Sequence, residues 1–143
     1  MINSRKIEDL SPKLQAKALR HVSECKKQGI DLLIYCTYRD FEAQNALYAQ
    51  GRTTAGGIVT MAKGGESWHN YRAAYDCVPL RQGKPVWNQV TTQDKELWLK
   101  VGTLGEACGL EWAGRWTGEL KETAHFQDSQ GLTFAQARAG GIK

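Results

Sequence analysis

Apolar residues recur at helical spacing near the start of the chain. Leu14, Ala18, Val22 and Cys25 would share one face of a helix, within a segment that opens at Ser11-Pro12 and closes at Gly29. Serine is a favoured N-cap and proline fits the first helical turn, whereas glycine commonly follows the last turn. The pattern therefore predicts an amphipathic helix between these points, with one face packed on the core.

A continuous apolar run over residues 31–36 comes next and predicts a short buried strand. Asp40 can then cap a second helix that runs to about Gln50, with Gly51 as its stop. Residues 51–66 contain five glycines and few large apolar side chains, which is a long loop for a compact domain. We interpret this loop in two ways that stay open at this point: a mobile lid beside a site, or plain surface disorder.

The middle of the chain has the pattern of a β-hairpin. Residues 73–80 predict one strand and residues 85–87 its return strand, with a turn over 81–84 that contains glycine. The hairpin makes antiparallel pairing the expectation for the sheet.

A third helix is predicted after the hairpin. Thr91 or Thr92 can cap it, apolar positions recur from Leu97 to Cys108, and Gly109 would end it. Like the first helix, it would bury one stripe against the core.

Short strands are predicted over residues 110–112 and 124–126. The order of elements indicates an α+β fold: a single small domain over residues 1–143, with a central antiparallel sheet flanked by about three helices. We expect a core over about 10–127 and a weakly structured tail over about 128–143. No separate cell-wall-binding domain is expected.

Composition narrows the function classes only slightly. Hydrophobic residues make up 41% and charged residues 24% of the chain, and the formal net charge is +4 with both signs interspersed. A mild positive charge favours approach to anionic polymers such as nucleic acid or bacterial cell wall. No clustered Lys/Arg face or recognition motif supports a nucleic-acid binder, so no nucleic-acid partner is expected.

The sequence shows no targeting segment, and its cysteines show no redox or metal-binding motif. No apolar segment of a signal peptide is visible, and no run approaches the length needed to cross a membrane, so neither secretion by a leader nor membrane insertion is expected. The four cysteines form no CxxC pair. We expect buried or half-buried thiols in a protein made in a reducing cytoplasm.

Two segments carry the candidate chemistry: residues 67–76, with His69 and Asp76, and residues 122–125, with Glu122 and His125. Catalytic zinc usually takes three protein ligands and leaves a position for water. A His2Asp set would be available, and Glu122 would be left to handle the proton of that water. His21 has no acidic neighbour at ligand spacing, and we assign it no role.

The spacing sets geometric conditions on this site. His69 and Asp76 are seven residues apart, so on one straight strand they would face opposite sides of the sheet. They can share a metal only if residues 70–72 form a turn and Asp76 lies on the strand that follows. Glu122 must likewise lie in a turn before His125. Each residue alone is more commonly a surface or hydrogen-bonding group, so the joint pattern carries the argument.

That joint pattern resembles the LAS metallopeptidases, which include D-Ala-D-Ala dipeptidases and phage L-alanyl-D-glutamate endopeptidases. Their signature is SxH, an Asp seven residues after the His, and a distal D/E-x-x-H. The similarity covers roughly residues 10–127 and is greatest to phage endolysins. The matching segments are Ser67-Trp68-His69, Asp76, Glu122-Thr123-Ala124-His125, Thr37-Tyr38-Arg39, 42–52 and 112–116.

The resemblance implies the LAS fold (the hedgehog and D-Ala-D-Ala peptidase-like fold) and a role for each matching residue. Glu122 would be the catalytic base, Arg39 would polarise the scissile carbonyl or hold a substrate carboxylate, and Ser67 and Gln44 would line the substrate side. One Zn²⁺ would be the cofactor. The implied zinc ligands are His69, Asp76 and His125.

The chain departs from the family pattern at three positions, none of which removes a ligand. Many phage members have Asp at the position of Glu122, whereas D-Ala-D-Ala enzymes have Glu. Arg72 replaces a glycine that is common in the phage group, and Gln127 stands where an acid often follows. The first departure leaves the exact bond open.

The expected function is a zinc-dependent peptidoglycan endopeptidase that cuts the L-alanyl-D-glutamate bond of the stem peptide. As a phage endolysin it would be a monomer, made in the host cytoplasm, released through a holin and active on peptidoglycan in the periplasm of a Gram-negative host. One alternative is a D-Ala-D-Ala carboxypeptidase or dipeptidase with the same metal. A non-catalytic, zinc-stabilised binding module is another, although Glu122 and Arg39 argue against it.

Overall fold

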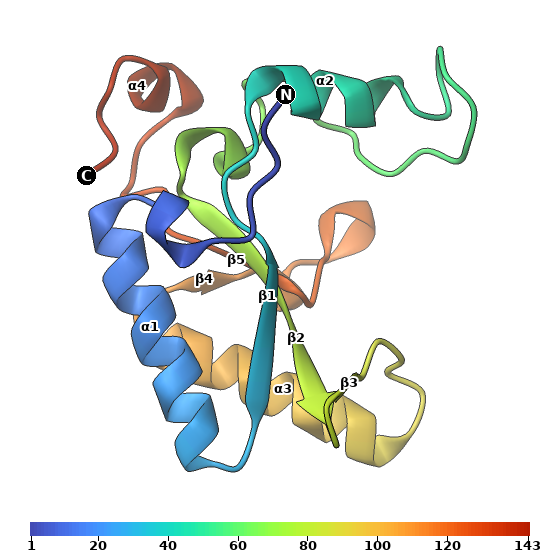
Figure 1. The fold of residues 1–143 in the computed structure, drawn as a ribbon, viewed down its shortest axis with the longest axis vertical. Coiled ribbons are helices and arrows are strands. Elements are labelled where there is room, and N and C mark those ends of the chain that lie inside the picture. The colour runs from blue at the N-terminus through green and yellow to red at the C-terminus, as the bar shows by residue number, and fades with distance from the viewer.

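An antiparallel sheet forms the centre of the computed structural model, which describes residues 1–143 (Figure 1). Its strands run in the order β1-β2-β5-β4, with β3 paired to the end of β2. The strands are β1 (Asp31–Cys36), β2 (Ala74–Arg81), β3 (Lys84–Pro85), β4 (Glu111–Trp112) and β5 (His125–Gln127). The predicted α+β class with an antiparallel sheet is confirmed.

Four helices surround this sheet, three of which the sequence predicts. They are α1 (Pro12–Lys27), α2 (Phe41–Ala49), α3 (Thr92–Ala107) and α4 (Phe134–Arg138). In Figure 1, α1 and α3 lie against the sheet, whereas α2 lies beyond its upper end together with the loop that follows. Four 3-10 turns complete the fold: η1 (Ile7–Asp9), η2 (Trp68–Tyr71), η3 (Ala113–Arg115) and η4 (Gly118–Leu120).

The helix starts follow the sequence signals, with one exception. Asp40 and Thr91 each accept a hydrogen bond from the third residue beyond, at Ala43 N and Asp94 N, as N-caps do. Ser11 occupies the cap position of α1 but makes no side-chain cap, and its buried hydroxyl has no partner. Here the proline that follows Ser11 pre-sets the helical turn without help from the serine.

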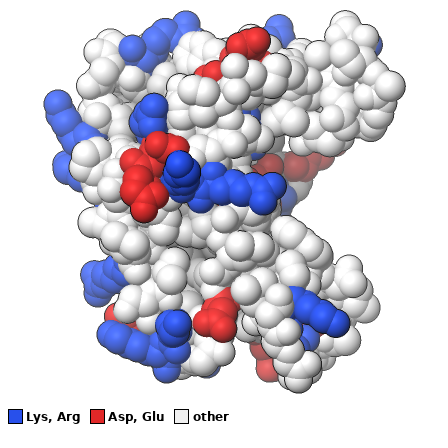
Figure 2. Space-filling view, viewed as in Figure 1, with Lys and Arg blue, Asp and Glu red and all other residues white.

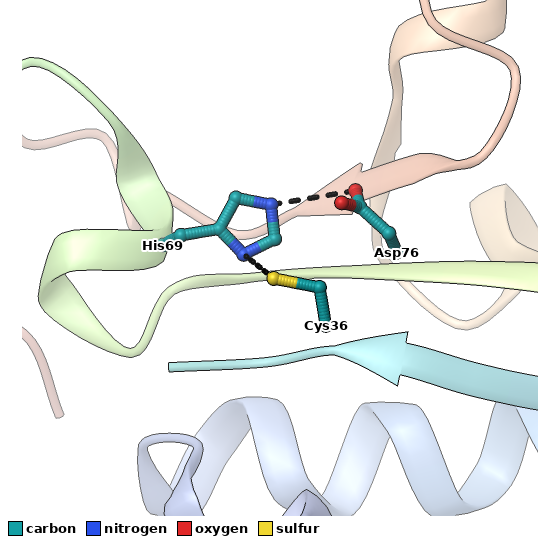
Figure 3. A group of neighbouring side chains, drawn as sticks. All are labelled: Cys36, His69 and Asp76. Atoms are coloured by element: carbon teal, nitrogen blue, oxygen red, sulfur yellow. Dashed lines mark hydrogen bonds and ion pairs between the residues drawn. The ribbon is translucent and has the colours of Figure 1, made fainter. Parts of the chain in front are cut away.

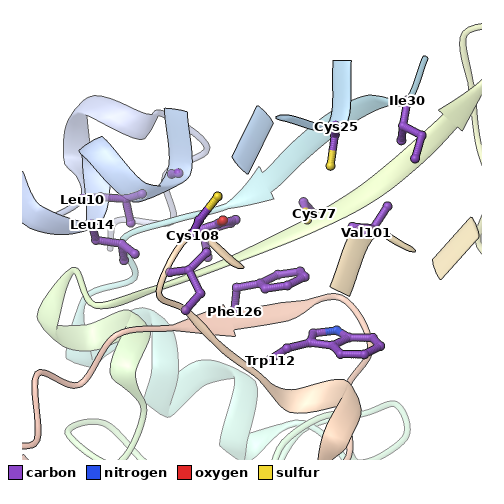
Figure 4. Close-up of a cluster of buried hydrophobic side chains, with 12 residues drawn as sticks. Leu10, Leu14, Cys25, Ile30, Cys77, Val101, Cys108, Trp112 and Phe126 are labelled. Atoms are coloured by element: carbon purple, nitrogen blue, oxygen red, sulfur yellow. The ribbon is translucent and has the colours of Figure 1, made fainter. Parts of the chain in front are cut away.

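The core lies between α1, α3 and one face of the sheet. Twelve buried residues form a single cluster, in which Tyr75, Cys77 and Phe126 come from β2 and β5 (Figure 4). Gly102 and Gly105 let α3 approach closely, because a Cβ atom at these positions would collide with the rings of Trp112 and Phe126. The buried side of α3 therefore includes these glycines. Of the predicted stripe, Val101 and Cys108 are buried, whereas Leu97 and Leu104 are half-buried.

His21, to which the sequence assigned no role, is a core residue. It is fully buried; its Nδ1 lies 2.7 Å from the Tyr75 hydroxyl and its Nε2 lies 2.8 Å from the Val101 carbonyl oxygen. Its ring also packs edge-on against Phe126, at 4.7 Å between centroids. Both ring nitrogens are thus paired, as burial of a polar side chain requires.

The tail is more ordered than the prediction. Residues 128–143 contain α4, which begins with a capping box between Thr133 and Gln136. Phe134 stacks on Trp68 and Tyr71 of η2, at 4.5 and 6.0 Å between ring centroids. The prediction of a weakly structured tail was wrong, because α4 is too short for hydrophobic periodicity and only its capping box is visible in the sequence.

The predicted hairpin is present, but its first strand lies one residue later than predicted and its turn is shorter than 81–84. Gln82 and Gly83 form its turn with φ of 53° and 76°, the left-handed conformations of a two-residue hairpin loop. The return strand β3 covers residues 84–85, whereas the sequence predicted 85–87. Val86 still donates a backbone hydrogen bond to Pro79, and the chain then leaves the sheet.

The surface and the cysteines agree with the composition. Lys and Arg side chains are mixed with Asp and Glu on the face that Figure 2 shows, and this face is notched between the part that carries α2 and the part that carries the β2–β3 hairpin. All four cysteines are free and buried, as predicted. None of the helices has the length and apolar character needed to cross a membrane.

We predict that His21→Leu lowers the free energy of unfolding by about 1–3 kcal/mol, because the buried Tyr75 hydroxyl and Val101 carbonyl lose their partner. Urea unfolding followed by circular dichroism measures this change. Leu19→Ala, at a position 57% exposed on the same helix, serves as the control and should cost less than about 0.5 kcal/mol. An equal loss in both variants would contradict the core role of His21.

Candidate metal centre

Three elements bring the predicted ligands together at the upper end of the sheet. His69 comes from η2, Asp76 from β2 and His125 from β5. Asp76 and His125 are direct partners in the β2–β5 ladder, so their side chains leave the sheet on the same face. The turn predicted for residues 70–72 is the end of η2, where Arg72 adopts a left-handed conformation with φ of 60°.

The ligand atoms converge on one carboxylate oxygen. Asp76 Oδ1 lies 3.3 Å from His69 Nε2 and 3.1 Å from His125 Nδ1. Both imidazoles are buried, with 4% and 8% of their residue surface exposed. The structure therefore brings the predicted His2Asp set together in one largely buried site.

Hydrogen bonds on the far side of each ring select the nitrogen that faces the site. His69 Nδ1 donates to the Thr37 carbonyl oxygen at 2.8 Å, so Nε2 is the nitrogen that faces Asp76. His125 Nε2 donates to Gln127 Oε1 at 2.8 Å, which leaves Nδ1 directed at the same carboxylate. Such outer partners fix the tautomer and orientation of metal-binding histidines.

The charges in the site are strongly coupled. Burial lowers the pKa of His69, but the adjacent Asp76 carboxylate outweighs burial and raises this pKa to about 10. Burial pushes the pKa of Asp76 upward, yet the two histidines outweigh it and hold that pKa well below its usual range. A cation that binds at His69 Nε2 must therefore displace a proton from a site already arranged for positive charge.

The donor set fits zinc. Two imidazole nitrogens and one carboxylate oxygen are a common catalytic set for this ion, and the other nitrogen of each ring is already satisfied. Cys36 is also nearby, with its sulfur 3.7 Å from His69 Nδ1. Figure 3 shows that Cys36 and Asp76 lie at opposite edges of the His69 ring, so Cys36 does not share the nitrogen that faces Asp76.

Glu122 lies at the mouth of the site. Its Oε2 is 3.8 Å from His125 Nδ1, and its side chain is 62% exposed. Glu122 precedes β5 in a turn closed by a hydrogen bond from His125 N to Glu122 O, as the spacing argument required. The carboxylate is close enough to serve the metal site and exposed enough to meet solvent.

Arg39 and Gln44 form a connected pair beside the ligands. Arg39 Nη1 donates to Gln44 Oε1 at 2.9 Å, and Gln44 Nε2 donates to the Ala62 carbonyl at 2.8 Å. Through these two hydrogen bonds, Gln44 connects Arg39 to the glycine-rich loop. The Gln44 side chain is buried, with 1% of the residue surface exposed, and it also lines the cleft. Ser67 also lines the cleft and accepts a hydrogen bond from His69 N at 3.3 Å.

These residues line a cleft of about 780 Å³. One wall comes from residues 58–62 of the glycine-rich loop, and another from Trp116, Glu119 and Leu120. The loop over residues 51–66 thus stands beside the site, where a lid would have to be. Its motion stays a prediction.

Comparison with known proteins agrees with this geometry. The chain is 36% identical over 123 residues, covering 83% of its length and 73% of the relative, to peptidoglycan L-alanyl-D-glutamate endopeptidase CwlK of Bacillus subtilis (strain 168). The chain belongs to the LAS-type zinc peptidase family. A protein-family model described as D-alanyl-D-alanine carboxypeptidase also matches residues 60–128.

Solved structures of LAS-type peptidases share the fold. The L-Ala D-Glu endopeptidase ChiX of Serratia marcescens matches with a TM-score of 0.58 at 19% identity, over 95% of this chain and 87% of that chain. The LD-carboxypeptidase LdcB matches with a TM-score of 0.59 at 18% identity, over 92% of this chain and 71% of that chain. Because it belongs to this family, the chain is a peptidase. The peptidases of this family are zinc-dependent.

Sequence reasoning missed several neighbours of the LAS-type site. The Thr37 carbonyl carries no side-chain signal, and Gln127 was noted only as a departure from the family. Cys36 lies 3.1 Å from Arg39 Nη2, a contact created by the strand end. Phe134 lines the cleft from the tail that was expected to be weakly structured. Of these, only the spacing of His125 and Gln127 on one strand could have been found in advance.

We predict that Gln127→Leu weakens zinc binding by about 10- to 100-fold, because His125 loses the acceptor that fixes its tautomer. Gln127→Glu keeps an acceptor and should bind zinc nearly as tightly as the wild type. Competition with a chromophoric chelator measures the affinity, and His69→Ala, which removes a ligand, sets the scale for complete loss. Exposed Gln93→Leu on α3 is the matched control. Wild-type affinity in Gln127→Leu would refute the role of Gln127.

Proposed function

We propose that this peptidase is a zinc-dependent peptidoglycan endopeptidase that hydrolyses the L-alanyl-D-glutamate bond of the stem peptide. The observation that carries the proposal is the convergence of His69, Asp76 and His125, with Glu122 at the mouth and Arg39 inside the same cleft. The 36% identity to CwlK, whose name gives this activity, supports the choice of bond.

The proposed reaction divides between the ion and the residues around it. Zinc, when held by the two imidazoles and Asp76, supplies a Lewis acid that activates water at neutral pH. Glu122 accepts the proton of the attacking water at its carboxylate and returns it to the leaving amine. Arg39 donates from its guanidinium to the scissile carbonyl or to a substrate carboxylate, and so stabilises the negative charge that develops.

Two further residues prepare this cleft for substrate. Gln44 holds the guanidinium of Arg39 in place, which lowers the cost of ordering it when substrate binds. Ser67 caps η2 and keeps His69 at its position, and its exposed part faces the cleft. Both residues therefore support the substrate side of the site.

We further propose that the protein is a phage endolysin. It would act as a monomer on peptidoglycan in the periplasm after release from the host cytoplasm through a holin. The resemblance of the motif segments to phage endolysins and the cell-wall substrate motivate this proposal. Expression of the chain in a Gram-negative host with and without a co-expressed holin tests it, since lysis should depend on the holin.

The second candidate is a D-Ala-D-Ala carboxypeptidase with the same residues in the same roles. The family model that matches residues 60–128 bears this description. The two candidates differ in the product that they release.

We predict that purified peptidoglycan digested with the zinc-loaded protein yields new L-Ala carboxyl ends and free D-Glu amino ends. Mass spectrometry of the soluble fragments identifies these ends. A chelator should abolish the products and added zinc should restore them. Release of D-Ala alone would favour the carboxypeptidase, and no cleavage by zinc-loaded protein would favour a binding module.

We predict that Glu122→Gln keeps zinc but loses activity by about 10²- to 10⁴-fold, because the amide cannot accept the proton of the attacking water. Turnover of purified peptidoglycan and zinc content by atomic absorption are measured together. Glu119→Gln, which removes a carboxylate from the same cleft, controls for the loss of negative charge and should lose less than about tenfold. Full activity in Glu122→Gln would contradict the base assignment.

A further inference from the structure

A pair of aromatic side chains stands outside the cleft described above, on the face of the sheet that carries the metal site. The Tyr35 and Trp87 rings pack edge to face, with centroids 5.3 Å apart and planes at 75°. Trp87 is 56% exposed, although it is among the largest apolar side chains of the protein. An exposed tryptophan supported by a second ring is a ready surface for a ligand with an apolar face.

Tyr35 places this pair next to the metal ligands. In the β1–β2 ladder, Ile34 pairs with Cys77 and Cys36 pairs with Asp76, so Tyr35 is the extra residue of a bulge beside Asp76. Burial raises the pKa of the Tyr35 hydroxyl, and the nearby carboxylates of Asp76 and Glu122 raise that pKa further. The Tyr35–Trp87 pair therefore lies next to the predicted metal site.

The backbone on both sides holds Trp87 in place. Trp98 Nε1 donates to the Val86 carbonyl at 2.9 Å, immediately before Trp87. Gln89 Nε2 donates to Thr123 Oγ1 at 2.7 Å, which ties the segment after Trp87 to the turn that carries Glu122. A ligand that packs on Trp87 would thus be held at a fixed position relative to Glu122, the proposed base.

The two ends of the site differ in chemistry. Arg39 and residues 58–62 lie on the α2 side, with a guanidinium inside the cleft. Trp87 follows β3 in the chain by two residues, and the hairpin part that carries β3 is separated from the α2 part by a notch (Figures 1 and 2). The α2 side thus suits an anionic group, and the hairpin side suits an uncharged, partly apolar one.

The proposed substrate has the same asymmetry across its scissile bond. After the bond comes D-glutamate, which carries a carboxylate; before it comes L-alanine, whose nitrogen is linked through a lactyl group to an amino sugar of the glycan strand. With the carboxylate on the Arg39 side, the sugar falls one residue beyond the metal on the opposite side. Sugar rings present apolar C–H faces that pack on aromatic rings.

We propose that Tyr35 and Trp87 form a subsite for the amino sugar that bears the stem peptide. This inference rests on the proposed endopeptidase function and adds to it the recognition of the glycan. The enzyme would thereby prefer stems that are still attached to the glycan over free peptides of the same sequence.

The test compares two substrates that differ only in the sugar: an N-acetylmuramoyl-L-alanyl-D-glutamyl peptide and the N-acetyl-L-alanyl-D-glutamyl peptide of the same length. We expect the wild type to have the higher kcat/KM on the sugar-linked peptide. In Trp87→Ala the ratio of the two kcat/KM values should fall by about tenfold, mainly through KM, as for the loss of one ring contact. Trp87→Phe keeps a ring and should retain most of the preference.

Leu99→Ala on the outer face of α3, at a position 47% exposed, controls for the loss of an exposed apolar side chain. An unchanged ratio in Trp87→Ala, with both substrates cleaved, overturns the sugar subsite alone. The same holds if the wild type shows no preference for the sugar-linked peptide. Failure of the zinc-loaded wild type to cleave either substrate overturns the proposed function and the subsite with it.

Discussion

The register between β2 and β5 is the constraint on which the site depends. Asp76 faces His125 across this ladder, and a slip of one residue would turn one of the two into the core. The neighbouring pair, Tyr75 and Phe126, points the other way and is fully buried, with rings stacked at 5.7 Å. Because apolar burial fixes that pair, the same alternation delivers both ligands to the cleft.

The third ligand depends on a different set of contacts, which also control Arg39. Arg39 N donates to the His69 carbonyl at 3.1 Å, and Asn70 Nδ2 donates to the Arg39 carbonyl at 2.8 Å. These two hydrogen bonds join the segment after β1 to η2, so that a metal ligand and a guanidinium are placed together. Gln44 extends this connection to the loop over residues 58–62. A shift of this loop should therefore move the Arg39 side chain.

Balanced hydrogen bonding explains how so polar a site survives inside a small domain. Two buried histidines and a largely buried carboxylate would be costly if unpaired. Each imidazole has an oxygen acceptor on its outer edge and the shared carboxylate on its inner edge. His21 shows the same rule in the core without any metal, since both of its nitrogens are also paired.

The sequence by itself determined the class of fold, most element boundaries and the identity of the predicted ligand set. Strand β1 and the caps of α2 and α3 were predictable because apolar runs and capping residues act locally. The family signature named His69, Asp76 and His125, and the need for a turn between the first two was a matter of spacing alone.

Only the tertiary structure decided what surrounds those residues. The Thr37 carbonyl and Cys36 reach the site from the end of β1, and α4 covers η2 through Phe134. A bulge and a loop bring Tyr35 and Trp87 together outside the cleft. These contacts join residues far apart in the chain, and their partners include backbone atoms that every residue type possesses. No local pattern records such pairings, because they follow from how the sheet and its loops pack.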